Sequence, residues 1–105
     1  MADITRMRDL CHDETIKTTR HFTDRLVERL IEYDDVISAI IDGEIIEEYP
    51  TAYPHPCALL LHLTTGDKPL HVVAGTDGIY LWLITAYHPT LDKWNSDYKT
   101  RKAVD

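Results

Sequence analysis

Three side chains that can bind an anion recur at four-residue intervals in this chain: His21, Arg25 and Arg29. Residues four apart lie on the same face of a helix, so this spacing predicts a cationic stripe about two turns long. An apolar stripe should run beside it and face a core, formed by Phe22, Leu26 and Leu30. The cationic stripe can hold a phosphate or a carboxylate through its guanidinium groups, or it can pair with the acidic side chains of the chain itself.

Three further side chains, His71, Thr85 and Tyr87, have the chemistry to act on a phosphodiester. Imidazole exchanges a proton near neutral pH, so His71 is the best candidate for a general base or acid. Thr85 and Tyr87 can donate hydrogen bonds, and a tyrosine ring can also stack on a nucleobase. Simpler alternatives stand beside these roles: His71 can be a buried, satisfied histidine in a sheet, and Thr85 and Tyr87 can pack in a strand.

Together these six residues have the side-chain types that metal-independent RNA cleavage, leaving a 2′,3′-cyclic phosphate, would require. The reaction needs a base for the 2′-hydroxyl proton, cations or donors for the phosphorane, and an acid for the leaving 5′-oxygen. Arg25 and Arg29 would clamp the phosphate. His71 would exchange protons, with His21 as a second acid or base.

Neither a metal nor a cofactor is expected. His55, Cys57 and His62 have metal-binding side chains, but alternation along a strand would point Cys57 and His62 to opposite faces. The four glycines are too scattered to form a loop that cradles a phosphate.

The charge of the chain is unevenly distributed. The formal net charge is −7, yet residues 30–67 contain eight acidic side chains and no lysine or arginine. A protein whose main task is to hold nucleic acid usually has a net basic surface, so any phosphate site here must be local.

Length and composition predict a single domain over residues 1–105, with its core at about 13–95, because 105 residues that are 44% hydrophobic can bury a modest core. No apolar run approaches the roughly 18 residues of a membrane span, and the first residues do not resemble a signal peptide. Cys11 and Cys57 are isolated thiols, which suit a reducing compartment. We therefore expect a cytoplasmic protein without a membrane partner.

The elements that must position the six residues follow from periodicity and turn signals. We predict a short helix in 1–11, a helix from about 14 to 31 capped by Asp13, and a third helix capped by Asp34 and ended by Gly43. Strands are predicted over 44–49, 57–63, 70–74 and 79–87. This order predicts an α+β fold in which two to three N-terminal helices pack on one face of a four-stranded antiparallel sheet.

Strand alternation sorts the candidate residues between the two faces of the sheet. Leu81, Leu83, Thr85 and Tyr87 should share one face of the last strand. A hairpin that pairs residue 75 with residue 79 places His71 roughly opposite residue 83, with Thr85 and Tyr87 further along.

Several short motifs occur in an order that resembles a known bacterial family. They are His21, Arg25 and Arg29, then Gly-Glu-Ile-Ile-Glu-Glu-Tyr-Pro at 43–50, Pro-Leu-His-Val-Val at 69–73, and Ile-Thr-Ala-Tyr-His-Pro at 84–89 with Trp94. The chain resembles a domain-of-unknown-function family that is often encoded beside zinc-finger proteins of the MqsA antitoxin type. That family is distantly similar to RelE-type toxins, which pack two or three helices on an antiparallel sheet and are usually metal-independent ribonucleases.

The resemblance implies a toxin-like component of a bacterial toxin–antitoxin pair. Its substrate would be RNA, and its partner would be a zinc-finger or helix-turn-helix antitoxin. One feature departs from the pattern: RelE-like toxins are typically basic, whereas this chain is acidic.

A non-enzymatic alternative is a binding or adaptor module that holds a protein partner through its cleft or through the acidic residues Glu44, Glu47 and Glu48. The two hypotheses predict different structures. In an enzyme, His71, Arg25 and Tyr87 should converge on one open, electropositive cleft. In an adaptor, they should be buried or paired internally, with an exposed apolar patch elsewhere.

Overall fold

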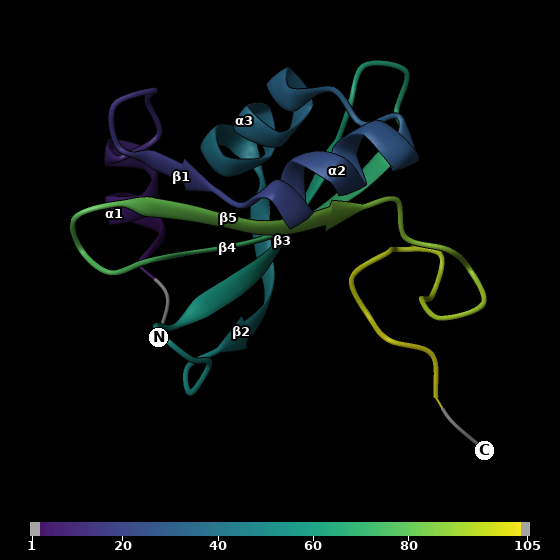
Figure 1. The fold of residues 1–105 in the computed structure, drawn as a ribbon. Coiled ribbons are helices and arrows are strands. Elements are labelled where there is room, and N and C mark those ends of the chain that lie inside the picture. The colour runs from purple at the N-terminus through teal and green to yellow at the C-terminus, as the bar shows by residue number, and fades with distance from the viewer. Residues whose placement is uncertain (1–2, 104–105) are drawn as a thin grey trace.

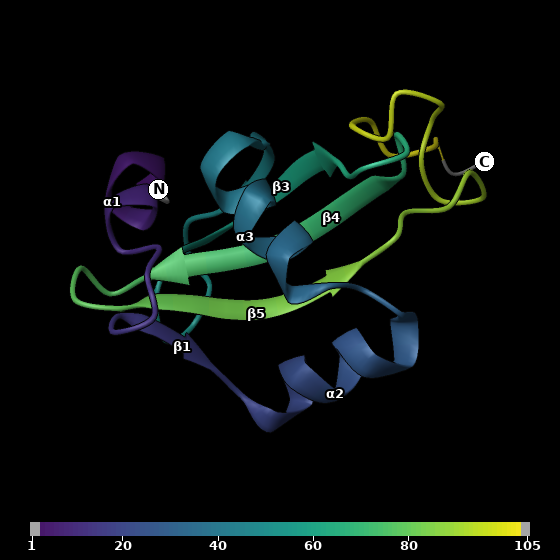
Figure 2. The same cartoon turned by 90° about the horizontal axis from the view of Figure 1, so that it is seen from above.

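The computed structural model describes residues 3–103 as three helices and one five-stranded sheet. The helices are α1 (Ile4–Asp9), α2 (Arg20–Arg29) and α3 (Tyr33–Asp42). The strands are β1 (Ile16–Thr18), β2 (Glu44–Tyr49), β3 (Cys57–Leu63), β4 (Pro69–Thr76) and β5 (Leu81–Tyr87), in the sheet order β1-β5-β4-β3-β2. The helices lie over the same side of the sheet, and the segment after β5 (88–103) turns back at the end of the sheet (Figures 1 and 2). The predicted α+β class with three helices is confirmed.

One continuous core lies between the helices and the sheet. Alternate residues of β4 and β5 point into it, and Phe22 and Leu26 of α2 and Val36 and Ile40 of α3 close it from above. Leu30, which the apolar stripe predicted to face this core, is 88% exposed. The helix ends at Arg29 and Leu30 has left-handed backbone angles (φ 55°), so the chain turns and buries Ile31 in place of Leu30.

The prediction of a helix from residue 14 to 31 is wrong in its first third. Residues 16–18 form β1, which pairs in parallel with the start of β5, and α2 begins only after Thr19. The Thr19 hydroxyl accepts a hydrogen bond of 3.1 Å from the backbone N–H of Phe22, so Thr19 rather than Asp13 is the cap. The β-branched residues at positions 16, 18 and 19 favour the extended backbone that precedes α2. The sheet is therefore five-stranded and mixed, not four-stranded and antiparallel.

The third helix also begins differently from the prediction, because Glu32 rather than Asp34 is its N-terminal cap residue. Its predicted end at Gly43 is confirmed. The N–H of Gly43 donates to the carbonyl of Ala39 at 2.9 Å, and a Cβ at this position would lie 2.2 Å from that oxygen. Glycine is therefore required here by close approach.

The predicted hairpin register between β4 and β5 is wrong, because Thr76 pairs with Leu81 and His71 lies opposite Tyr87. The connecting turn is wider than a two-residue hairpin, because residues 77–80 lie between the paired residues Thr76 and Leu81. Within this turn, the Asp77 carboxylate accepts hydrogen bonds from the backbone N–H groups of Ile79 and Tyr80. A β-bulge at Ile84 then adds one unpaired residue. Together these shifts bring His71 opposite Tyr87 instead of residue 83.

The bulge also changes which side chains share a face. Beyond it, Ala86 joins Leu81 and Leu83 in the core, and Tyr87 lies on the helix-free face with His71. Uninterrupted alternation had placed Tyr87 on the same face as Leu81. The helix-free face is the one that the C-terminal segment partly covers.

Candidate functional site

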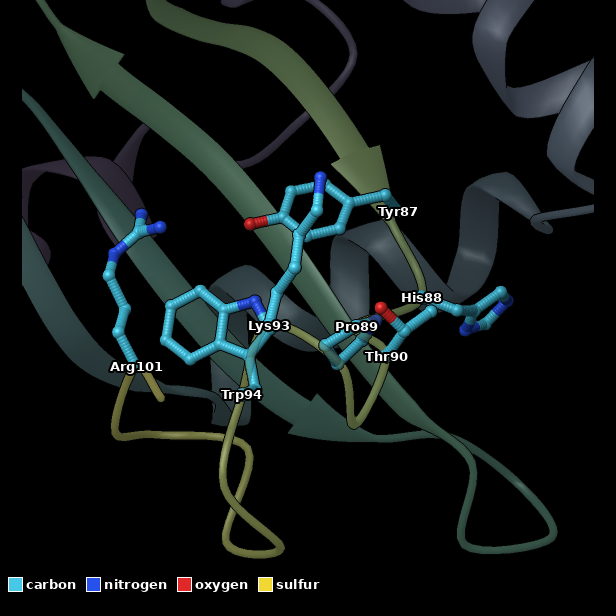
Figure 3. A pocket seen from close by; sticks show the side chains of 7 residues that line it. All are labelled: Tyr87, His88, Pro89, Thr90, Lys93, Trp94 and Arg101. Carbon is cyan, nitrogen blue, oxygen red and sulfur yellow. The ribbon is translucent and has the colours of Figure 1, made fainter. Parts of the chain in front are cut away.

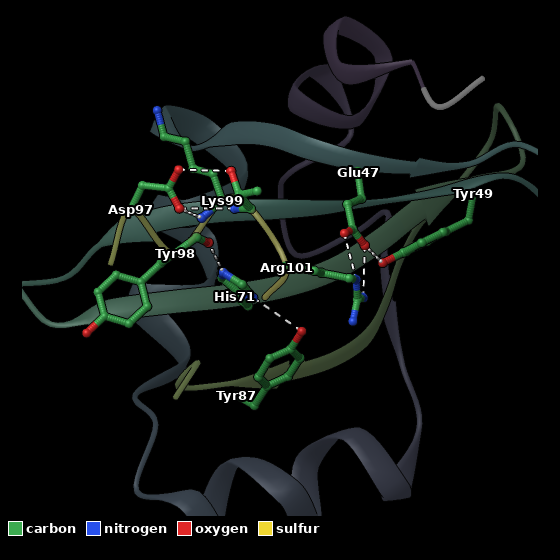
Figure 4. A network of polar contacts seen from close by, with 9 residues as sticks. Glu47, Tyr49, His71, Tyr87, Asp97, Tyr98, Lys99 and Arg101 are labelled. Atoms are coloured by element: carbon green, nitrogen blue, oxygen red, sulfur yellow. Dashed lines mark hydrogen bonds and ion pairs between the residues drawn. The ribbon is translucent and has the colours of Figure 1, made fainter. Parts of the chain in front are cut away.

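His71 lies at the centre of a polar network on the helix-free face (Figure 4). It is fully buried, its Nε2 is 2.7 Å from the carbonyl oxygen of Tyr98, and its Nδ1 is 3.2 Å from the hydroxyl of Tyr87. A carbonyl oxygen only accepts, so Nε2 carries the proton and Nδ1 of the neutral ring accepts from Tyr87. Burial lowers the pKa of His71, although the Tyr98 carbonyl acts in the opposite direction. The ring is therefore neutral, with both nitrogens occupied.

Aromatic rings enclose this imidazole. The ring of Trp94 lies edge-on to His71 with centroids 4.6 Å apart, and the ring of Tyr87 is tilted at 68° with centroids 5.3 Å apart. Trp94 is itself only 3% exposed. His71 thus fastens the C-terminal segment to the sheet through one hydrogen bond and one ring contact.

Two ion pairs attach the same segment to β2. The Arg101 guanidinium donates from Nε and Nη2 to the two carboxylate oxygens of Glu47, at 2.8 and 2.9 Å, and it also lies over the Trp94 ring. This pairing lowers the pKa of Glu47, while burial and the same carboxylate raise the pKa of Tyr49 to about 12. Lys99 pairs with Glu44 at 2.9 Å. Glu44 and Glu47, which were offered for a basic partner, are therefore already paired within the chain.

The predicted cationic stripe does not act as one unit. Arg29 donates to the carbonyl oxygen of Ala86 at 2.8 Å and lies 3.4 Å from the Thr85 hydroxyl. It thereby binds the edge of β5 beyond the end of β1. Arg25 instead pairs with Glu28 at 2.6 Å.

His21 is exposed, and within residues 3–103 its side chain has no polar partner. The structure thus brings together two pairs of predicted site residues, His71 with Tyr87 and Arg29 with Thr85. His21 and Arg25 make no polar contact with either pair.

A groove of about 380 Å³ opens beside this network, where β5 ends. Its described lining consists of Tyr87, His88, Pro89, Thr90, Lys93, Trp94 and Arg101. None of these lining residues is acidic, in a chain whose formal charge is −7. Tyr87, Trp94 and Arg101 lie on one side, and the imidazole of His88 is directed away from them (Figure 3). The described lining thus carries two cationic side chains, Lys93 and Arg101, and no carboxylate.

His88 is held in a defined orientation. Its Nδ1 donates to the Pro69 carbonyl oxygen at 2.8 Å, which fixes the proton on Nδ1 and leaves the lone pair on Nε2. Across the described part of the chain, Nε2 has no partner. A neutral imidazole bound through one nitrogen can accept a proton at the other, as a general base does.

Sequence reasoning did not select His88, Lys93 or Arg101. His88 directly follows Tyr87, and this adjacency was the one available signal. Lys93 and Arg101 lie in an irregular segment, where no periodicity relates a side chain to a face of the sheet.

Residues 18–88 match the model of a family described as Domain of unknown function (DUF4258). The chain belongs to the DUF4258 family. The match includes all six predicted site residues and His88, and it ends before Lys93, Trp94 and Arg101, so the DUF4258 model covers only part of the groove. No curated protein and no solved structure matches the chain.

Other features of this DUF4258 protein bear on the predictions. In the described range 3–103, no helix is long and apolar enough to cross a membrane. Over the same residues, no three His, Cys, Asp or Glu side chains gather as metal ligands. Cys11 and Cys57 are both free thiols, and burial raises the pKa of each.

Proposed function

We propose that this DUF4258 protein is the toxin-like component of a bacterial toxin–antitoxin pair and that it cleaves RNA without a metal ion. The observation that supports this proposal is the groove at the end of β5. It combines Lys93, Arg101, an imidazole and a tyrosine, and its described lining has no carboxylate. A scissile phosphate is the anion that such a donor set accommodates.

Two cations would bind the phosphate. Arg101 uses Nε and Nη2 for Glu47, which leaves the N–H groups of Nη1 for a phosphate oxygen. The Lys93 ammonium supplies a second positive charge. Both would stabilise the negative charge that grows on the phosphorane oxygens. Arg29, Arg25 and His21 would contact flanking phosphates outside the groove.

His88 and Lys93 would exchange the protons. In an in-line displacement the attacking and leaving oxygens lie on opposite sides of phosphorus, so the base and the acid must approach from opposite sides. His88 Nε2 would take the 2′-hydroxyl proton, the 2′-oxygen would bond to phosphorus, and the bond to the 5′-oxygen would break. The Lys93 ammonium would protonate that oxygen, leaving a 2′,3′-cyclic phosphate. His71, predicted as the base, would instead position Tyr87.

The test is incubation of the purified protein with total RNA in EDTA, with product ends identified by mass spectrometry. We expect 2′,3′-cyclic phosphate ends, and a loss of about 100-fold in rate for Lys93→Ala, as is typical when one charge-stabilising or proton-transferring group is removed. His88→Asn keeps a donor for Pro69 and removes Nε2, so it should lose activity without unfolding. Lys68→Ala, an exposed lysine outside the groove, is the matched control. Equal cleavage by all four proteins would contradict this site.

A second candidate, the adaptor, is supported by a different observation. His71 is buried with both nitrogens bonded, and Arg25 is paired with Glu28, as the adaptor hypothesis expects. Val27 and Leu30 are 76% and 88% exposed at the end of α2 and would contact a protein partner such as an antitoxin. Absence of cleavage together with loss of partner binding in Val27→Ser would favour this function.

A further inference from the structure

A second hollow, of about 420 Å³, opens on the helix-free face of the sheet. Its described lining consists of Thr19, Pro54, His55, Asp77, Trp82 and Ile84. Trp82 and Tyr87 project from the same face of β5, because their β4 partners Gly75 and His71 are four residues apart on a regular strand. At the usual rise of about 3.3 Å per residue, Trp82 and Tyr87 lie roughly 13 Å apart along the sheet, and they line the hollow and the groove respectively. One extended ligand can therefore reach both.

The wall of this hollow is aromatic and held in place. The indole Nε1 of Trp82 donates to Asp77 Oδ2 at 3.2 Å, which fixes the plane of the ring. The His55 ring lies 5.9 Å from Trp82, centroid to centroid, and is inclined at 38°, so the two rings do not form a closed parallel stack. His55 Nε2 is buried and lacks a hydrogen-bond partner in the described chain. Buried polar atoms are rarely left unpaired. An unpaired ring nitrogen beside a hollow therefore favours a ligand there that supplies its hydrogen-bond partner.

Besides His55 Nε2, the hollow offers one acceptor and one donor to a ligand. Asp77 Oδ1 accepts from the backbone N–H groups of Ile79 and Tyr80, and these bonds lower the pKa of Asp77 to about 2. The carboxylate is therefore ionised, and Oδ2, which within residues 3–103 accepts only from Trp82, keeps a free lone pair. The Thr19 hydroxyl accepts from Phe22, while its own proton has no acceptor within residues 3–103.

We propose that this hollow binds a purine base that carries an amino group, with its ring against the Trp82 indole and its amino group donating to Asp77 Oδ2. Purines offer the largest π-face of the nucleobases, which suits an apolar, aromatic wall. Their amino group pairs with a carboxylate, and the Thr19 hydroxyl can donate to a ring nitrogen or carbonyl beside it. Uracil has no amino group, and its one donor on this edge, N3–H, lies between two carbonyl oxygens that the Asp77 carboxylate would repel. That the base belongs to an RNA strand rests on the proposed function, whereas binding of the base itself does not.

The test uses nucleosides, which carry no phosphate and so cannot bind through the cationic groove. The ¹⁵N-labelled protein is titrated with adenosine, guanosine, inosine and uridine, and the two indole N–H signals are followed by NMR. We expect adenosine and guanosine to shift the Trp82 signal, to leave the Trp94 signal unmoved, and to bind at least tenfold more tightly than inosine and uridine. Equal affinity for the four nucleosides, or no shift at Trp82, would overturn the proposal.

Asp77→Asn tests the recognition directly. The Asn oxygen can still accept from the backbone of residues 79 and 80, while an amide N–H₂ replaces Oδ2 and presents a donor to the ligand. The preference for adenosine over inosine should therefore reverse, because inosine carries a carbonyl oxygen where adenosine carries its amino group, and a merely structural role would not produce this reversal. Asp67→Asn, at an exposed turn with φ 61°, is the matched control and should leave the preference unchanged. An unchanged preference in Asp77→Asn would contradict the assignment.

Two further variants separate this inference from the proposed function. Trp82→Leu should weaken adenosine binding at least tenfold by calorimetry, and it serves as the second test if Asp77→Asn fails to fold. Lys93→Ala should slow RNA cleavage about 100-fold and leave adenosine binding unchanged, since Lys93 does not line this hollow. Adenosine binding without cleavage would overturn the proposed ribonuclease alone, and cleavage without adenosine binding would overturn the base site alone.

Discussion

Replacing His71 with leucine tests whether this residue is a structural link or a catalytic group. Leucine is of similar size and still fills the space under Trp94, but it has no polar atom. It therefore leaves the Tyr98 carbonyl and the Tyr87 hydroxyl without their hydrogen-bond partner. A buried polar group that loses its partner costs about 1–3 kcal/mol. Tyr87 and Tyr98 are only partly buried, so the lower end applies to each, and the loss should total about 2–3 kcal/mol.

Urea unfolding followed by tryptophan fluorescence measures this loss. With a urea slope of about 1–1.5 kcal/mol/M for a chain of this size, the midpoint should fall by roughly 2 M. Trypsin under native conditions should also cut after Lys99 and Arg101 faster than in the wild type, because the C-terminal segment loses its attachment to the sheet.

His62→Leu is the matched control, since His62 also lies on a strand and has no polar partner in the described part of the chain. We expect it to change stability by less than about 0.5 kcal/mol. If His71→Leu unfolds at the same urea concentration as His62→Leu and its C-terminal segment resists trypsin equally, the structural role assigned to His71 is wrong.

Two more predictions follow from the same contacts. Burial lowers the pKa of His71 in the folded protein, so the contribution of the neutral ring to stability is fully present above the ordinary pKa of about 6.5 and is lost as the pH falls below it. The urea midpoint should therefore be lower at pH 5.5 than at pH 7.5, and this difference should be smaller in His71→Leu. Gly43→Ala should lower the free energy of unfolding by more than about 2 kcal/mol, because its Cβ would lie 2.2 Å from the Ala39 oxygen. Gly66→Ala, at φ 91° in open space, should lower it by only about 1 kcal/mol. Thermal unfolding compares the two variants, and equal losses of stability would refute the steric argument.

Much of the fold was predictable because its signals are local. Apolar periodicity identified two of the helices, and the strands over 44–49 and 57–63 match β2 and β3 residue for residue. The first strand was missed because three residues carry too little pattern, and only pairing with β5 makes them extended. The register error had a similar origin, since a bulge at Ile84 depends on both strands and leaves no mark in either one alone.

The candidate site was predictable only in part. The type of His71 suggested proton exchange and that of Tyr87 suggested hydrogen-bond donation, and the structure does place the two side chains in contact. The burial of His71 beneath Trp94 could not be inferred, because the segment that brings Trp94 there has no regular structure. The same limit applies to Lys93 and Arg101, which approach Tyr87 only after the chain turns back at the end of the sheet.

The sequence by itself therefore determined the class of the fold and the uneven distribution of charge, since these depend on residues near one another along the chain. The tertiary structure alone decided which polar groups meet. It turned His71 from an expected base into a neutral link, and it gathered cations from an irregular segment into one groove. Such encounters depend on register, bulges and long-range chain paths, which are set by the free energy of the whole fold rather than by any local pattern.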